Sequence, residues 1–280
     1  MQSDTSPVLP AFPASLASRL TFEQDSQLRS KAVYLGDGVV LAHVAGRFKM
    51  YVVASDVSLA PHLMMNGYWE SWISVAFARA VVQRAPRTLV NVGANHGYYT
   101  LLAAALDHRM HIEAYEPQAR LATLIERSAL VNGFSGVQVL RQAAGSAHGS
   151  VWLEEHGDFL GSANVAAGAT AGRRAQGVPV VPLDSVSDAP IDMMLIDAEG
   201  YEFEILKGAE QRLARSAAPC LFLEFSAPRY ADKLAFVDWI GRHGLSVARI
   251  DHVGGLETMT LEALAACDTV VDIVLTGGAR

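Results

Sequence analysis

From residue 88 onward, short apolar segments of strand length alternate with longer segments that have the apolar spacing of helices. Parallel strands need crossover connections, which are usually helices, so this alternation is typical of a parallel sheet with helices on both faces. The pattern predicts a doubly wound α/β fold. The expected strands are 88–92, 111–115, 137–140, 193–196, 220–225, 245–250 and 270–275, and the expected helices are 98–106, 118–132, 201–213 and 231–243.

The composition is compatible with such a fold and argues against nucleic acid and anionic membranes as general partners. With 280 residues, of which 51% are hydrophobic and 18% charged, the chain can bury one sizeable core or two modest ones, which excludes a disordered or fibrous protein. The formal net charge of −7 offers no general attraction for nucleic acid or for an anionic membrane surface.

Neither cysteines nor apolar runs indicate secretion or membrane insertion. The two cysteines, Cys220 and Cys267, stand in apolar surroundings, which favours buried thiols in a reducing compartment and therefore a cytoplasmic protein. Prolines interrupt residues 1–20, so this stretch does not resemble a signal peptide. No apolar run approaches the roughly 20 residues that a membrane span requires.

The region before the alternating pattern is less regular. Residues 33–44 predict a hairpin around Gly36-Asp37-Gly38, and residues 68–83 have helical spacing. We therefore expect an accessory segment, residues 1–85, that covers an acceptor site on a main domain of residues 86–280.

A second irregular stretch follows the third expected strand. Residues 143–177 contain seven glycines among small residues, which predicts a loop with a short hairpin between 151–153 and 178–183. Within it, residues 154–177 are expected to form a mobile loop.

The segment Val92-Gly93-Ala94-Asn95-His96-Gly97 lies between the first expected strand and its helix. Small residues at such a turn let the backbone approach a ligand, and the helix N-terminus offers free N–H groups. Asn95 stands where a dinucleotide fingerprint has its second glycine, which disfavours a pyrophosphate. The candidate ligand that remains is a nucleoside without phosphate, whose amino-acid tail could occupy the turn. In the simpler alternative, the glycines only make a tight turn.

Glu116 ends the second expected strand, 23 positions after Gly93. A carboxylate at this place can accept hydrogen bonds from ribose hydroxyls. The alternative is that Glu116 is solvated.

Three motifs in this order resemble those of the FkbM family of S-adenosylmethionine-dependent methyltransferases: residues 90–100 (VNVGANHGYYT), 115–117 (YEP) and 195–202 (LIDAEGYE). The resemblance covers about residues 88–225 and departs at Ala198, where many relatives have valine. It implies a class I methyltransferase fold, a Rossmann-like seven-stranded sheet with an antiparallel last strand. It also implies S-adenosylmethionine as cofactor and O-methylation of a sugar, secondary metabolite or other small molecule, a biosynthetic role.

By this resemblance, Glu116 holds the ribose, the loop from Gly93 to Gly97 holds the methionine portion, and Gln142 and Ala143 lie near the adenine. The residues expected at the cofactor are Asn91, Gly93, Ala94, Asn95, Gly97, Tyr98, Glu116, Pro117, Gln142, Ala143 and Asp197. Of the adjacent Tyr98 and Tyr99, one is expected to face the cofactor and the other to pack, and the sequence does not say which.

Acidic residues at two further strand ends are candidates for the chemistry. Asp197 and Glu199 follow the strand 193–196, and Glu224 lies near the end of the next strand. A hydroxyl acceptor must lose its proton, and a carboxylate with a raised pKa is a suitable base. We expect Glu199 in this role, with Asp197 and His96 after it. Alternatively, Asp197 positions the methionine amino group and Glu199 caps the following helix.

Other functions stay open at this level. Asp197, Glu199 and Glu224 could share a divalent metal, but spacing reveals no further ligand, and we expect no metal site. A nicotinamide-dependent oxidoreductase uses a similar sheet, and a nucleoside-binding scaffold without catalysis could serve a biosynthetic complex. The sequence identifies neither the small-molecule or glycan acceptor nor the oligomeric state, and a homo-oligomer is compatible with it.

Overall fold

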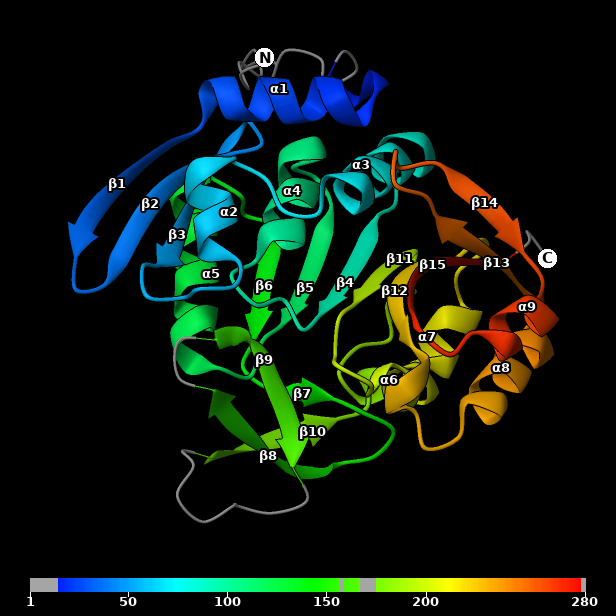
Figure 1. The fold of residues 1–280 in the computed structure, drawn as a ribbon. Coiled ribbons are helices and arrows are strands. Elements are labelled where there is room, and N and C mark those ends of the chain that lie inside the picture. The colour runs from blue at the N-terminus through cyan, green and yellow to red at the C-terminus, as the bar shows by residue number, and fades with distance from the viewer. Residues whose placement is uncertain (1–14, 157–158, 167–174, 278–280) are drawn as a thin grey trace, which may run out of the picture.

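A computed structural model of the chain describes residues 15–156, 159–166 and 175–277. Its central feature is an eight-stranded sheet with the strand order β14-β13-β15-β12-β11-β4-β5-β6 (Figure 1). These strands span β4 Thr88–Val92, β5 His111–Tyr115, β6 Val137–Leu140, β11 Met193–Ile196, β12 Cys220–Ser226, β13 Leu245–Ile250, β14 Leu256–Met259 and β15 Val270–Gly277.

The sheet has the predicted topology. Strands β6, β5, β4, β11 and β12 pair in parallel, and β15 inserts antiparallel between β12 and β13. The class I methyltransferase fold, with its antiparallel last strand, is confirmed. Strand β14 is an eighth strand at one edge of the sheet. The sequence pattern did not predict this strand, because its four residues are mostly exposed and form no apolar run.

Helices cover both faces of this sheet, as predicted for a doubly wound fold. One face packs against α3 (Ser71–Arg84), α4 (Tyr98–Leu106) and α5 (Ala119–Asn132). The other packs against α6 (Glu202–Lys207), α7 (Glu210–Ala214), α8 (Lys233–Arg242) and α9 (Leu261–Ala266). Three short 3-10 helices are Ser15–Ala17, Leu183–Ser185 and Ala227–Arg229.

The single helix predicted over 201–213 is wrong, because the chain breaks there into α6 and α7. Gly208 ends α6, and a Cβ atom at this position would lie 2.0 Å from the carbonyl oxygen of Gly145. The close approach of two backbones, rather than the apolar spacing of the segment, therefore decides where the helix ends.

The N-terminal segment forms more structure than the sequence predicted. It contains α1 (Arg19–Arg29), α2 (Ala60–Met65) and a meander of β1 (Lys31–Gly36), β2 (Val39–Val44) and β3 (Phe48–Val53). The β1–β2 hairpin is confirmed. An apolar cluster joins Phe48 and Phe77 of this segment to Phe222 of the central sheet, so the segment packs directly on the sheet face.

The glycine-rich stretch forms a second sheet with the order β7-β10-β8-β9. Its strands are β7 Ala143–Ala144, β8 Gly149–His156, β9 Phe159–Ala166 and β10 Ala175–Val181. The expected hairpin pairing is confirmed, since Val151 lies opposite Val178. The irregular structure expected for residues 154–177 is wrong where β8, β9 and β10 pair. Mobility of this stretch stays a prediction, and residues 157–158 and 167–174 lie outside the described chain.

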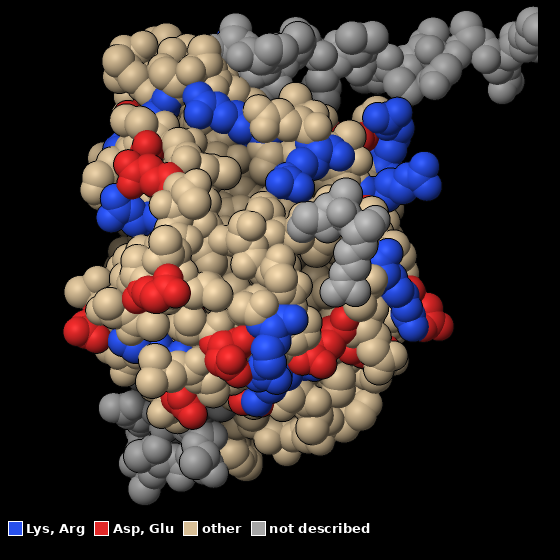
Figure 2. Space-filling model, turned by 90° about the vertical axis from the view of Figure 1, so that its right-hand side faces the viewer, with Lys and Arg blue, Asp and Glu red and all other residues tan. Residues whose placement is uncertain are grey.

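Around α8, α9 and β14, Lys and Arg side chains lie beside Asp and Glu side chains, so this face has no patch of one sign (Figure 2). Ion pairs in these elements include Arg242 with Asp238 and Arg249 with Glu257. Among the helices that the structure describes, none has the length and apolar character needed to cross a membrane.

Candidate active site

The glycine turn after β4 touches the turn after β11. Gly93 has a φ of 75°, and a Cβ atom there would lie 1.9 Å from the carbonyl oxygen of Asp197. Gly97, with a φ of 86°, begins α4, where a Cβ atom would lie 2.9 Å from Ile125. These contacts require glycine on steric grounds. They also bring the first strand end and Asp197 into one crevice at the carboxyl edge of the sheet.

Glu116 is buried directly beside this turn, with 3% of its surface exposed. Its Oε2 accepts a hydrogen bond from the Asn95 N–H at 2.7 Å, and its Oε1 accepts one from the Gln118 N–H at 2.8 Å. Burial raises the pKa of Glu116 to about 7, against the lowering effect of the two N–H donors. The alternative of a solvated Glu116 is therefore wrong.

A pocket of about 400 Å³ opens at the carboxyl ends of β11 and β12. Its four carboxyl groups come from four different parts of the chain, and its remaining lining is mostly apolar. We call it the carboxyl-edge pocket; it is lined by Glu70, Ile73, Tyr99, Leu195, Ile196, Asp197, Phe222, Leu223, Glu224, Ile250 and Asp272.

The carboxyl groups of this pocket all have raised pKa values. Burial raises the pKa of Glu70 and of Glu224 to about 7, and repulsion from neighbouring carboxylates adds to it. Asp197 keeps part of its surface exposed to solvent, but the protein atoms packed around its carboxyl group and the neighbouring carboxylates raise its pKa well above the usual range. Burial also raises the pKa of Asp272. The pocket therefore favours either protonated acids or a bound cation.

Two aromatic donors orient these acids. The Tyr99 hydroxyl donates to Oε2 of Glu70 at 3.2 Å, and the Trp72 indole N–H donates to Oδ2 of Asp272 at 3.1 Å. The hydroxyl of Tyr98 instead lies 2.9 Å from the Ser74 hydroxyl in the core. Of the two adjacent tyrosines, Tyr99 lines the pocket, and the side chain of Tyr98, which was expected at the cofactor, is buried in the core and does not line it.

Glu199 pairs with Arg229, whose guanidinium also lies 3.4 Å from Oε2 of Glu224. The helix-capping alternative for Glu199 is wrong, because the N-cap residue of α6 is Tyr201 and no side chain makes a capping hydrogen bond there. In the preceding turn, Oε1 of Glu202 accepts the N–H groups of Ala198 and Gly200 at 3.1 Å each. Arg229 was not expected here, since no local pattern links it to a residue 30 positions earlier.

Both ring nitrogens of His96 are engaged inside the protein. Nε2 accepts from the Val53 N–H at 3.3 Å, so Nδ1 carries the proton and donates to Oδ1 of Asn95 at 2.8 Å. Burial lowers the pKa of His96 to about 4. The ring ties the glycine turn to β3 and does not line the carboxyl-edge pocket.

The remaining expected cofactor residues lie along the same edge. Asn91, in β4, donates from its amide to the Thr100 hydroxyl at 2.9 Å, and its Oδ1 atom is buried without a hydrogen-bond partner in the described chain. Gln142 follows β6 and leads into β7, which starts at Ala143. Ala94 and Pro117 flank the Glu116 contacts in sequence, and Ala94 is buried.

Within the described residues, no three His, Cys, Asp or Glu side chains are placed to hold a metal ion.

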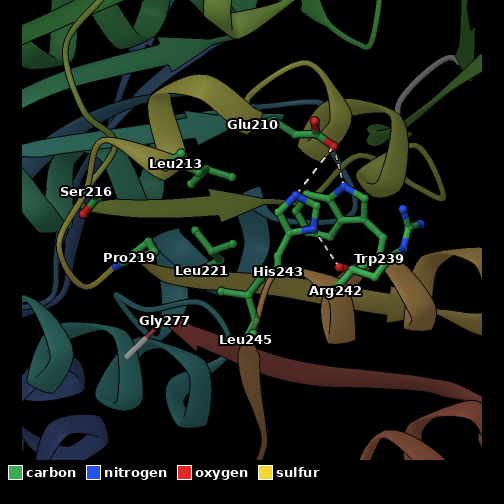
Figure 3. A pocket seen from close by; sticks show the side chains of 12 residues that line it. Glu210, Leu213, Ser216, Pro219, Leu221, Trp239, Arg242, His243, Leu245 and Gly277 are labelled. Atoms are coloured by element: carbon green, nitrogen blue, oxygen red, sulfur yellow. Dashed lines mark hydrogen bonds and ion pairs between the residues drawn. The ribbon is translucent and has the colours of Figure 1, made fainter. Parts of the chain in front are cut away.

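A larger pocket, of about 1050 Å³, lies at the opposite, amino-terminal edge of the sheet (Figure 3). We call it the amino-edge pocket. Its polar groups satisfy one another: the Trp239 indole N–H donates to Oε1 of Glu210 at 2.6 Å, and Nδ1 of His243 donates to the Trp239 carbonyl at 2.8 Å. In open α/β sheets the ligand crevice lies at the carboxyl ends of the strands, which favours the smaller pocket as the reaction site.

Comparisons with known proteins agree with this fold. Residues 91–245 match the sequence model of the methyltransferase FkbM domain. A structure described as a transferase from Pyrococcus horikoshii is 12% identical, with a TM-score of 0.50 over 87% of this chain and 72% of that chain. At this identity the similarity shows the fold alone. No curated protein matches the sequence.

Two further structures have lower TM-scores. Methyltransferase FkbM from Methylobacillus flagellatus is 18% identical, with a TM-score of 0.44 over 68% of this chain and 43% of that chain. The present chain thus spans less than half the length of that protein. An O-methyltransferase from Bacillus cereus in complex with SAH is 13% identical, with a TM-score of 0.45 over 79% of this chain and 86% of that chain.

Proposed function

The chain belongs to the methyltransferase FkbM family, whose model matches more than half of its 280 residues, and we propose that it methylates a hydroxyl group of a small molecule or glycan with S-adenosylmethionine. The observation that carries this proposal is the close approach of the glycine turn to Asp197, since Asp197 also lines the carboxyl-edge pocket.

The residues at the strand ends fit S-adenosylmethionine. Each oxygen of Glu116 accepts one backbone N–H and has a second lone pair left, which suits the two ribose hydroxyls. The buried Oδ1 of Asn91 is an acceptor without a partner in the described chain, which suits a donor on the ligand. The carboxyl groups of the pocket attract a cation, and the cofactor carries a sulfonium.

Among the pocket acids, we assign Asp197 to the cation and Glu70 to the acceptor proton. When bound, S-adenosylmethionine supplies a methyl group that an oxygen takes while the carbon–sulfur bond breaks and its electron pair stays on sulfur. Asp197 lies next to the glycine turn, and a carboxylate there stabilises the cationic end of the ligand.

Glu70 comes from the N-terminal segment, on the acceptor side of the pocket. The Tyr99 hydroxyl donates to its Oε2, and the Trp69 side chain also donates to this carboxyl group, which we assign to accept the hydroxyl proton. Its pKa of about 7 suits a base that works near neutral pH. Glu199, the base favoured by sequence, is paired with Arg229, and His96 is engaged on both nitrogens, so neither is retained in this role.

A methyl-transfer assay tests the proposal. The full chain is incubated with S-adenosylmethionine carrying a ¹³C methyl group and with a panel of sugars, polyols and amines, and the products are analysed by ¹³C NMR. We expect a methyl carbon bonded to oxygen. A methyl carbon bonded only to nitrogen or carbon would contradict the assignment to a hydroxyl.

Calorimetric titrations separate the proposal from its two rivals. We expect the chain to bind S-adenosylmethionine and not NADH. Binding of NADH alone would favour the oxidoreductase. Binding of S-adenosylmethionine without transfer to any acceptor of the panel or to extracted metabolites would favour the scaffold.

A further inference from the structure

The outer edge of strand β3 is bonded to side chains of the main domain. Strand β3 is an edge strand of the N-terminal meander and lies beside α5 (Figure 1). In an antiparallel strand, alternate N–H groups point to the same edge. Three such N–H groups donate to side chains outside the meander: Lys49 to Oδ1 of Asn132 at 2.9 Å, Tyr51 to Oγ of Ser128 at 2.9 Å, and Val53 to Nε2 of His96 at 3.3 Å.

Of these three acceptors, only His96 belongs to the glycine turn, since the other two lie on α5. Because Nε2 accepts from Val53, Nδ1 carries the ring proton, and it donates to Oδ1 of Asn95 at 2.8 Å. The exposed fraction of His96 is 0%, so water does not compete for either bond. The ring therefore joins β3 to one defined residue of the turn.

Asn95 extends this contact to the acid that is proposed to bind the ribose. Its backbone N–H donates to Oε2 of Glu116 at 2.7 Å. The φ angle of Asn95 is 52°, a conformation that a residue with a side chain adopts at a cost, and the bonds to His96 and Glu116 hold it there. A continuous chain of hydrogen bonds thus runs from Val53 through His96 and Asn95 to Glu116.

We propose that His96 is a positioning residue of the cofactor site: held by β3, it fixes Asn95 so that the Asn95 N–H keeps the Glu116 carboxylate in place for the ribose. A carboxylate that is already in place loses less freedom on binding, which lowers the Kd of the ligand. This role of His96 rests on the proposed function, in which Glu116 binds S-adenosylmethionine. It gives the N-terminal segment a part in cofactor binding, in addition to supplying Glu70.

His96→Gln separates the two bonds of the ring. The amide oxygen of Gln reaches the place of Nε2 and accepts from Val53, but Gln has no donor at the place of Nδ1, so the bond to Asn95 is lost. We expect the Kd of S-adenosylmethionine to rise about 3- to 10-fold, the effect of one hydrogen bond. Calorimetric titration of the full chain measures it.

Asn95→Gly removes the same bond from its other side. Gly adopts a φ of 52° without strain, so this variant keeps the path of the turn and loses only the Oδ1 acceptor. We expect the Kd to rise by a similar factor. An unchanged Kd in folded His96→Gln or in folded Asn95→Gly would overturn the proposal.

Ser128→Ala is the matched control. It removes an equivalent bond at the same edge of β3, the one from the Tyr51 N–H, but outside the glycine turn. Thermal melting compares the stability of the variants, and we expect Ser128→Ala to leave the Kd within about twofold of the wild type. If Ser128→Ala raised the Kd as much as His96→Gln, His96 would act only through the general stability of the N-terminal segment, which would overturn the proposal.

A double-mutant cycle tests whether His96 acts through Glu116. In the Glu116→Ala background, His96→Gln should change the Kd by less than about twofold, because the carboxylate that it positions is gone. Equal factors in both backgrounds would overturn the proposal and leave the ribose assignment intact, since Glu116→Ala alone would still raise the Kd. If Glu116→Ala by itself left the Kd unchanged, the assignment of Glu116 to the ribose would fail, and the role of His96 with it.

Discussion

The two pockets at the two edges of the central sheet differ in size and in chemistry. The larger pocket has polar groups that are paired with one another, and the smaller pocket has acids with shifted pKa values. The amino-edge pocket has about 1050 Å³ of empty space, which includes open solvent at its mouth, and its Glu210, Trp239 and His243 bind one another. The carboxyl-edge pocket holds about 400 Å³ and gathers carboxyl groups whose pKa values burial and mutual repulsion raise. Carboxyl groups whose pKa values are strongly shifted by burial indicate a functional site better than the volume of a pocket does.

Backbone strain separates the two edges in the same way. Glu70, Asn95 and Glu199 have φ angles of 37°, 52° and 54°, a region that residues with a side chain rarely adopt. Glu70 lines the carboxyl-edge pocket, and Asn95 and Glu199 lie in the turns that follow β4 and β11. In the lining of the amino-edge pocket, the one positive φ belongs to Gly244, which adopts it without strain. Strain of this kind often gathers where a site must be held in one geometry.

The largest expected effect is on turnover. Glu70→Gln should lower kcat by about 10²- to 10⁴-fold, because it removes the group that accepts the proton. The wild-type kcat should rise as the pH passes through about 7, where Glu70 loses its proton, and the variant should lose this rise. Methyl-transfer rates between pH 5 and 9 check both.

The amino-edge pocket supplies the control for this variant. Glu210→Gln should leave kcat within about twofold of the wild type, since surface-type changes away from a site have small effects. If Glu70→Gln and Glu210→Gln lowered kcat by the same factor, the proposed functional difference between the two pockets would be contradicted.

A smaller effect is expected on cofactor affinity. Glu116→Ala should raise the Kd of S-adenosylmethionine about 10- to 100-fold, because hydrogen bonds to a charged group are worth about 1.5–3 kcal/mol. Calorimetric titration measures it, with Glu210→Ala as the control at the other edge. An unchanged Kd for Glu116→Ala would place the ribose elsewhere.

The smallest effect is on stability, and it depends on pH. In the folded chain the pKa of Glu70 is about 7, above the ordinary value of 4.5, so folding favours its protonated form. The protonated Glu70 therefore contributes to the free energy of unfolding. This contribution is fully present below pH 4.5 and is lost as the pH rises through about 7. Glu70→Gln should therefore raise the melting temperature at pH 8 more than at pH 5. Calorimetry measures the melting temperatures. A larger increase at pH 5 than at pH 8 would contradict the raised pKa of Glu70.

Much of the fold could be predicted because its signals are local. The bounds of β4, β5, β6, β11 and α4 coincide with the predicted segments, since each is an apolar run between turn residues. In the second sheet the pairing of β8 with β10 was predicted, but β7 and β9 were missed, because these two strands are rich in small residues and their pairing depends on partners across the sheet. The break at Gly208 depends on a backbone contact with Gly145, which no periodicity reveals.

The site was predictable where a motif carried it. Glu116 and Asp197 stand at strand ends that the motifs identify, and the structure brings both to the carboxyl edge. Glu70 and Asp272 were missed because they reach the pocket from distant parts of the chain; Trp72 and Asp272, which are hydrogen-bonded, stand 200 positions apart. The local signal that points to Glu70 is an acid in an aromatic stretch, with Trp69 before it and Trp72 two positions after it.

The most direct test of the central claim is a crystal structure of the chain with S-adenosylmethionine or S-adenosylhomocysteine. We predict both ribose hydroxyls within hydrogen-bond distance of the Glu116 carboxylate and the sulfur atom facing Asp197. A ligand seated in the amino-edge pocket, or one bound at the carboxyl edge without touching Glu116, would contradict the claim.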